Sequence, residues 1–413
     1  MNVALNSELE NLEEYELYCE GRLDDPYPLF DQLRERNPVH WSERLSSWLI
    51  TRYDDVYACL SDPRLASNRT SAYMRTLPEP QRTELQPLGE HISNWLGFTD
   101  PPKHTRMRKL VSKVFTPRLA EDMRDRIQAI VRTLLDRVQP RGQMDIIKDF
   151  AFPLPATVIC EILGIDSDKQ EQFKAYLDDI NAFVGGFGPS LARTADQAYK
   201  SQKEVASFLR ELSLQRRHQP LGDMISSLAA VEGIDDGLTE QELLGLCVFL
   251  FSAGEETTVS LIGNGIFLLM HNPDELERLR KQPELSKSAI EEFLRYESPI
   301  QILPRLATED IELRNRQIGK GQAVILVLGS ANRDPSIFPD PDQLDIDRKN
   351  NRHLAFGWNI HFCLGAPLAR IEGQIAISSL IQQFPNIRLQ DNIALNWREN
   401  LTIRCLESLP VQF

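Results

Sequence analysis

The 413-residue sequence has few cysteines, no secretory leader pattern and no apolar run long enough to cross a bilayer. Its six cysteines lie at least forty residues apart, so they form neither a CxxC pair nor a small disulfide framework. Residues 1–26 carry eight acids and one base, without the basic start and apolar centre of a signal peptide. The longest apolar stretch, Leu243 to Ala253, is shorter than the roughly 20 residues that span a bilayer. We therefore expect a globular, cytoplasmic protein with no membrane anchor.

Positive charge is also scarce. Sixty acidic residues against 46 basic ones give a formal net charge of -14. A surface of that sign is repelled by phosphate backbones, so we expect no nucleic acid partner. Hydrophobic residues make up 42% and charged residues 26%, which is enough to bury a large core and keep the surface polar.

Helical periodicity dominates from about residue 104 to 280, with short strands on either side. Residues 38–41 and 47–51 are aromatic or β-branched segments separated by a polar turn, which predicts a hairpin. Apolar residues repeat at i, i+3 and i+4 over residues 118–138, after a Thr116 cap, which predicts one helix.

A second helix is expected over residues 155–163, and residues 182–190 contain three glycines, two phenylalanines and a proline, which predicts a mobile apolar loop. Short strands are expected near the C-terminus at 311–313, 317–318, 323–328 and 401–405. The chain is therefore mainly α with a minor β portion. Without βαβ alternation, a Rossmann or barrel scaffold is excluded.

The longest predicted element begins after Thr239, which forms a capping box with Glu242. The apolar pattern continues to Met270, where Asn272 and Pro273 end it, giving a helix of about 31 residues or roughly 46 Å. A helix this long and this apolar must lie buried at the centre of the molecule.

A cysteine segment, residues 356–365, carries the strongest chemical signal. Cys363 stands between a turn-rich stretch and a helix expected to start near Leu364, where unpaired N–H groups and the helix dipole favour a thiolate. A buried, inert cysteine is the ordinary alternative. Zinc suits the segment less well, because His361 and Cys363 lack two further ligands at finger spacing.

Two adjacent glutamates, Glu255 and Glu256, interrupt the long helix and are costly there unless they have partners. The preceding Ala253 and Gly254 lack bulk, so a planar cofactor or small ligand can approach the helix backbone. Thr257 can hydrogen-bond back to the carbonyl of Ala253 and so loosen the helix. Taken alone, the segment is equally compatible with a polar break that faces the surface.

The cysteine segment resembles the haem-binding loop of the cytochrome P450 family, F-G-x-G-x-H-x-C-x-G. The residues that match are Phe356, Gly357, His361, Cys363 and Gly365. Asn359 stands where the second glycine usually lies, and asparagine tolerates a left-handed backbone best among the other residues. In the long helix, residues 253–257 resemble the family's oxygen-activation motif.

The resemblance implies which residues would bind the haem and which would deliver protons. Cys363 would be the axial thiolate of the iron and Phe356 would pack over it, while Glu256 would relay protons and Thr257 would hold them where O2 is activated. The residues that would contact the cofactor are His104, Arg108, Ala253, Arg305, Phe356, His361, Cys363 and Gly365.

The motif E-x-x-R, here Glu292 and Arg295, implies a buried structural pair rather than a catalytic one. Its third partner would come from residues 341–344. Gln343 stands there in place of the usual arginine, which implies a weaker or neutral third corner.

The resemblance covers about residue 25 to the C-terminus. It implies a cytochrome P450 fold in one domain over residues 1–413, with an N-terminal extension of about 1–25. The long central helix would lie over the haem, beside small antiparallel sheets. The expected protein is a monomeric monooxygenase of the EC 1.14 class that binds haem b and O2. Electrons from NAD(P)H would reach it through a separate ferredoxin and reductase.

A peroxide-driven peroxygenase and a haem-based gas sensor remain alternatives, but neither needs the Glu256–Thr257 pair. Epoxidation, desaturation or coupling can use the same residues as hydroxylation. A polyketide, terpenoid, steroid or fatty acid would suit the pocket, which is also expected to draw on residues 68–98 and 182–190 and on the stretch near Leu401. The further pocket residues expected are Phe249, Ala253, Ile300, Gln301 and Leu303. The cations expected to attract a ferredoxin are Arg106, Lys109, Lys113, Arg352 and Arg370.

Overall fold

The structure is a computed structural model that describes residues 24–185, 189–234, 236–391 and 393–413. The α-helices are α1 (Tyr27–Arg36), α2 (Tyr53–Cys59), α3 (Thr70–Thr76), α4 (Glu79–Glu84), α5 (Gln86–Ile92), α6 (Lys103–Val111), α7 (Pro117–Asp122), α8 (Arg124–Val138), α9 (Pro153–Leu163), α10 (Gln170–Val184), α11 (Pro189–His218), α12 (Met224–Ala229), α13 (Glu240–His271), α14 (Pro273–Lys281), α15 (Ser286–Tyr296), α16 (Leu328–Ala331) and α17 (Ala366–Gln383). The strands are β1 (Val39–Ser42), β2 (Ser47–Ile50), β3 (Leu65–Ala66), β4 (Gln143–Asp145), β5 (Ile302–Ala307), β6 (Ile311–Leu313), β7 (Arg316–Ile318), β8 (Ala323–Val327), β9 (Arg388–Leu389) and β10 (Pro410–Gln412).

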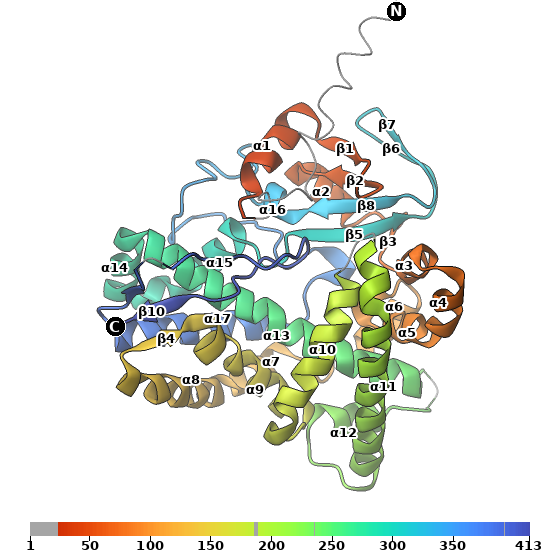
Figure 1. Ribbon diagram of the computed structural model, residues 1–413, viewed down its shortest axis with the longest axis horizontal. Helices are drawn as coiled ribbons and strands as arrows, with labels where there is room; N and C mark the ends of the chain where they lie inside the picture. The colour runs from red at the N-terminus through yellow and green to blue at the C-terminus, as the bar shows by residue number, and fades with distance from the viewer. Residues whose placement is uncertain (1–23, 186–188, 235, 392) are drawn as a thin grey trace, which may run out of the picture.

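Helices make up most of the molecule, and the largest sheet lies at one end (Figure 1). This sheet has the strand order β1-β2-β8-β5-β3, and the predicted hairpin forms its β1–β2 edge. The expectation of small antiparallel sheets holds for every described strand pair except one. β2 and β8 run parallel, which is possible because a long connection and no tight turn joins them. Smaller sheets join β4 to β10 and β9, and β6 to β7.

The central helix α13 matches its prediction closely. The Thr239 side chain accepts a hydrogen bond from the Glu242 backbone, and the Glu242 side chain accepts one from the Thr239 backbone. Among the described helices, only α13 has the length and hydropathy to cross a membrane. Its apolar window is 67% buried inside the fold, which is typical of a core helix.

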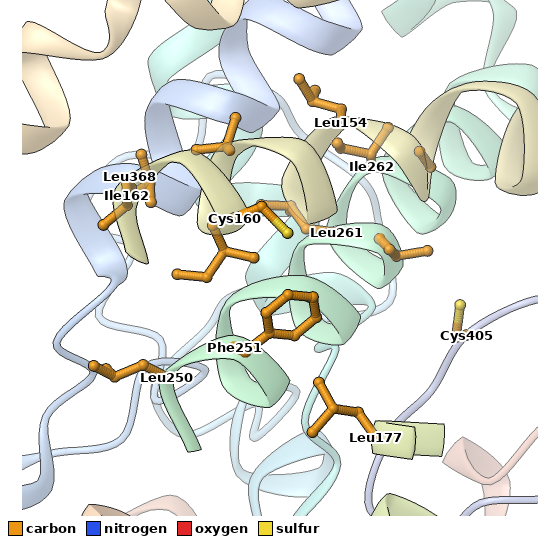
Figure 2. Packing of buried hydrophobic residues seen from close by; sticks show 14 of the residues in the cluster. Leu154, Cys160, Ile162, Leu177, Leu250, Phe251, Leu261, Ile262, Leu368 and Cys405 are labelled. Carbon is orange, nitrogen blue, oxygen red and sulfur yellow. The ribbon is translucent and has the colours of Figure 1, made fainter. Parts of the chain in front are cut away.

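The core is built where α9, α10 and α17 pack around α13. Figure 2 shows side chains from these helices meeting, with Phe251 of α13 between Cys160 of α9 and Leu177 of α10. Gly254 of α13 faces Ile159 of α9, whose side chain lies only 3.3 Å from the position that a Cβ would occupy. The close approach of these helices therefore depends on the absence of a side chain there.

The E-x-x-R pair is buried, as the resemblance implies, but its third corner differs from the prediction. Arg295 donates to both carboxylate oxygens of Glu292 at 2.8 Å, and neither side chain is exposed. Arg348, rather than residue 343, completes the network, with its Nε 3.1 Å from both oxygens of Glu292. Gln343 contributes only its backbone carbonyl, so the third corner is charged and not neutral.

Several predicted boundaries also shift. The single helix expected over 118–138 is divided at Met123 into α7 and α8, with the predicted Thr116 cap in place. The loop expected over 182–190 is shorter, because α10 continues to Val184 and α11 begins at Pro189; residues 186–188 lie outside the described residues. The strand expected over 401–405 is replaced by the isolated bridges Ile300–Ile403 and Trp397–Leu406. The predicted N-terminal extension falls almost wholly outside the described residues.

Candidate functional site

A mostly apolar cavity of about 360 Å³ separates α13 from the cysteine segment. Ala253 and Thr257 of α13 line one side, and Phe356 and Cys363 line the other. The two motifs that stand out in the sequence, about a hundred residues apart, therefore face the same space.

Cys363 lies at the start of α17, as its motif predicts. Its backbone N–H donates to the carbonyl of Phe356 at 2.8 Å, which closes the loop that precedes the helix. Asn359 adopts a φ of 59°, so the left-handed turn that the family builds with glycine is made here by asparagine. Burial raises the pKa of the Cys363 thiol, while N–H groups of Gly365 and Ala366 and the charge of Arg108 oppose that rise. The same N–H groups can stabilise a thiolate once a metal replaces the proton.

The predicted cations gather at one edge of the cavity. The rings of His104 and His361 lie 4.2 Å apart, and Arg108 donates to the Phe362 carbonyl at 2.7 Å. Arg305 is 5% exposed, and burial lowers its pKa to about 10. Burial also lowers the pKa of His361 to about 3, with His104 and nearby arginines adding to the shift. The cluster therefore concentrates positive charge that an anion would stabilise.

These residues fit a haem, whose two propionates are carboxylates. Both ring nitrogens of His104 are buried without a hydrogen-bond partner, although it lies beside the arginines. Ala253 presents its small side chain to the cavity, and the walls around Cys363 are largely apolar. An apolar slot with a sulfur at its centre and cations at one edge suits a planar macrocycle with anionic substituents.

The polar groups on α13 make one predicted contact and two that the sequence did not predict. The Thr257 hydroxyl donates to the carbonyl of Ala253 at 2.8 Å. Glu256 lies 3.3 Å from the amide nitrogen of Asn181 on α10 and 3.5 Å from Nη1 of Arg398 near the C-terminus. Burial raises the pKa of Glu256, and Arg398 opposes this rise.

Two further carboxyl groups lie near this motif. Burial, with the adjacent Glu256, raises the pKa of Glu255 to about 8, so it avoids the cost of an unpaired buried charge by staying protonated at neutral pH. Glu372 of α17 lines the cavity, is 1% exposed and has a pKa raised to about 8 by burial, which a hydrogen bond with Thr258 opposes.

Most of the residues predicted to form a substrate pocket face this cavity. Phe249, Ala253, Ile300 and Leu303 line the cavity, together with Trp95 to Phe98 from the predicted segment 68–98. Gln301 does not line it. Its amide nitrogen donates to the Ser298 carbonyl and the Tyr27 hydroxyl, and these two bonds hold the side chain away from the cavity. Leu401 itself packs into the cluster around α1, but its neighbours Asn400, Thr402 and Ile403 line the cavity, as predicted for this stretch.

Polar cavity residues that sequence reasoning missed are Ser67, Asn181, Ser252 and Glu372. Arg69, Asn400 and Thr402 also line the cavity, and they lie in the predicted segment 68–98 and in the predicted stretch near Leu401. Ser67 lies 3.1 Å from Nε2 of His361, and the Ser252 hydroxyl donates to Asn181 at 2.7 Å. Ser252 directly precedes the motif of residues 253–257, and Glu372 lies nine residues after Cys363, whereas Ser67 and Asn181 lie far from both motifs.

Comparison with known proteins agrees with this geometry. The family model described as Cytochrome P450 matches residues 75–392. A protein of Bacillus subtilis (strain 168) named Cytochrome P450 is 39% identical over 407 residues, which is 97% of each chain. The 6-deoxyerythronolide B hydroxylase of Saccharopolyspora erythraea is 39% identical and covers 94% of this chain and 96% of its own.

A solved structure shows that the similarity extends to the fold. The crystal structure of P450BioI in complex with an acyl carrier protein ligated to hexadec-9Z-enoic acid is 38% identical to this chain. The alignment covers 95% of this chain and 99% of that one, with a TM-score of 0.87. The chain therefore belongs to the cytochrome P450 family and is a haem-iron monooxygenase of the EC 1.14 class that acts on a small molecule.

Proposed function

We propose that the protein binds haem b through Cys363 and inserts oxygen from O2 into an apolar or amphipathic small molecule, by hydroxylation or epoxidation. One observation carries the proposal. Cys363, which receives N–H groups at the start of α17, faces across the cavity the helix turn that holds Thr257. The haem, when bound, supplies the redox chemistry that activates O2.

The chain's own residues hold and orient the cofactor. Cys363 provides the sulfur ligand, and the N–H groups of Gly365 and Ala366 stabilise its negative charge. His104, Arg108, Arg305 and His361 surround the propionates and neutralise them.

Protons reach the reacting oxygen through Glu256 and Thr257. Glu256 exchanges protons with the solvent side, where Arg398 is 36% exposed. The Thr257 hydroxyl, held by the Ala253 carbonyl, passes a proton to the site where O2 reacts. Because Asn181 of α10 also contacts Glu256, the position of this carboxylate depends on three elements of the cavity wall.

The substrate is mostly apolar with a few polar groups. Phenylalanine, leucine and isoleucine side chains dominate the cavity, and Asn181, Ser252, Asn400 and Thr402 form a polar part of its lining. Such a lining suits a polyketide, terpenoid, steroid or fatty acid that carries a hydroxyl or carbonyl group. Relatives whose names include 6-deoxyerythronolide B and hexadec-9Z-enoic acid make this range of substrates reasonable.

Electrons come from a separate ferredoxin and its NAD(P)H-dependent reductase. Of the cations expected to attract the ferredoxin, Lys109, Lys113 and Arg352 are exposed. Arg106 is paired with Glu242, and Arg370 with Glu291, so these two contribute less to the surface potential. The described cysteines are all free thiols, in keeping with the reducing cytoplasm.

The ferrous protein under carbon monoxide tests the proposal. We expect the red-shifted Soret band of thiolate ligation, and Cys363→His should move it to the position of a histidine-ligated haem. Cys405→Ala is the matched control, because Cys405 is buried away from the cavity and its loss should leave the band in place. A wild-type band at the histidine position would overturn the assignment of Cys363. A spectral-shift screen of the four substrate classes against the ferric protein then tests the choice of substrate.

A further inference from the structure

A second ion cluster lies beside the cysteine segment, outside the cavity. Arg370 of α17 donates from Nε and Nη2 to the two carboxylate oxygens of Glu291 on α15, at 2.7 and 2.8 Å. Nε2 of His353, in the segment that leads into the cysteine loop, lies 3.1 Å from Oε2 of the same carboxylate. Three parts of the chain therefore meet at Glu291.

The cluster contacts the loop that carries the sulfur. The Arg370 guanidinium lies 4.5 Å from the centre of the Phe356 ring, and the carbonyl of Phe356 accepts the Cys363 N–H. The backbone N–H of Ala355 donates to Nδ1 of His353 at 3.2 Å. Nδ1 is therefore the acceptor of this ring, and Nε2 carries the proton that is donated to Glu291.

The charges in this cluster are fixed. Burial alone would raise the pKa of Glu291, but hydrogen bonds from Arg370 and His353 lower it to about 2. A two-point bond between a guanidinium and a carboxylate fixes both groups in orientation as well as in distance. Arg370 also favours the charged form of Cys363 by its positive charge. Glu291 thus determines where a cation near the sulfur is held and how much of its charge is neutralised.

We propose that Glu291 and Arg370 are positioning residues that set the electron affinity of the haem–thiolate unit. The inference rests on the proposed ligand role of Cys363. Reduction adds one negative charge to that unit, so a neighbouring cation favours reduction and a neighbouring anion opposes it. The two residues should therefore act with opposite signs. A pair that merely ties α15 to α17 would lower stability in both variants and leave electron affinity unchanged.

The test compares the reduction potential of the haem-loaded full chain in the wild type, the two single variants and the double variant. We expect Glu291→Gln to shift the potential upward and Arg370→Gln to shift it downward, with the double variant close to wild type. Arg370→Lys keeps the charge without the two-point bond, so its potential should lie nearer to wild type than that of Arg370→Gln. Shifts of the same sign in the two single variants, or no shift in either, would overturn the inference.

A remote ion pair provides the control. Arg216 at the end of α11 pairs with Asp223 before α12, and both side chains are largely buried. Arg216→Gln should lower the unfolding midpoint without moving the potential. The carbon monoxide spectrum of the wild type separates the two proposals. If the thiolate band is absent, the ligand assignment and this inference both fail; if it is present and the opposite shifts are missing, only this inference fails.

Discussion

Arg348 offers the sharpest test of how the haem-binding core is braced. Its side chain is only 10% exposed and its Nε lies 3.1 Å from both oxygens of Glu292. Its two Nη groups donate to backbone carbonyls at the exposed end of the network. The carbonyls that accept are those of Pro339, Asp340 and Gln343. We expect Arg348→Gln to destabilise the fold without removing the cavity.

The loss of stability in Arg348→Gln follows from the hydrogen bonds that Glu292 keeps. Glu292 keeps both bonds from Arg295, together with the Asp345 N–H and the Asn351 amide, so its charge is not left unpaired. The loss is then about one charge-assisted hydrogen bond, of order 1.5–3 kcal/mol. Water can replace the bonds to the exposed carbonyls. Arg295→Gln should cost more, about 3–5 kcal/mol, because it breaks a fully buried ion pair.

Urea unfolding of the haem-loaded and haem-free proteins measures both values as shifts of the midpoint at constant slope. Gln343→Ala is the control, because only the carbonyl of this exposed residue takes part, and its effect should stay within about 0.5 kcal/mol. An Arg348→Gln variant as stable as wild type would refute the reasoning. So would a Gln343→Ala variant as unstable as Arg348→Gln.

Three further predictions concern the cavity. Thr257→Ala should keep haem and substrate affinity but form less product and more hydrogen peroxide per electron pair, since the proton-holding hydroxyl is lost. Unchanged coupling of electrons to product would contradict this, and turnover with peroxide alone would favour a peroxygenase. Arg398→Gln should raise the pKa of Glu256 further, seen as an upward shift in the pH profile of coupling; an unmoved profile would exclude Glu256 as the relay. Burial lowers the pKa of His104 to about 4 and of His361 to about 3, so below about pH 6.5 the unfolded state takes up protons first. The haem-free protein should therefore lose stability between about pH 6.5 and 4, and more steeply than the haem-loaded protein, in urea titrations at each pH.

The sequence predicted well those structural features that depend on residues only a few positions apart in the chain. The capping box at Thr239, the bond from Thr257 to the Ala253 carbonyl and the left-handed turn at Asn359 all depend on neighbours along the chain. A helix or turn reports such spacing directly, because residues three or four apart share a face.

Several features that depend on tertiary contacts and lie outside the family motifs were missed. Glu292 and Arg348 are 56 residues apart, and Glu256 and Arg398 are 142 apart. No periodicity links such residues, and the family motif pointed to Gln343 instead. The amide of Gln301 turns away from the cavity for the same kind of reason, since its partner Tyr27 lies in the first helix.

The parallel pairing of β2 with β8 has a consequence for the order of synthesis. β2 ends at Ile50, while its partner begins at Ala323, so more than 270 residues must leave the ribosome before the sheet can close. Until then the free edge of the N-terminal hairpin can pair with another nascent chain. Closing so long a loop is slow, and chains that stop before Ala323 should aggregate through this edge rather than accumulate as folded fragments.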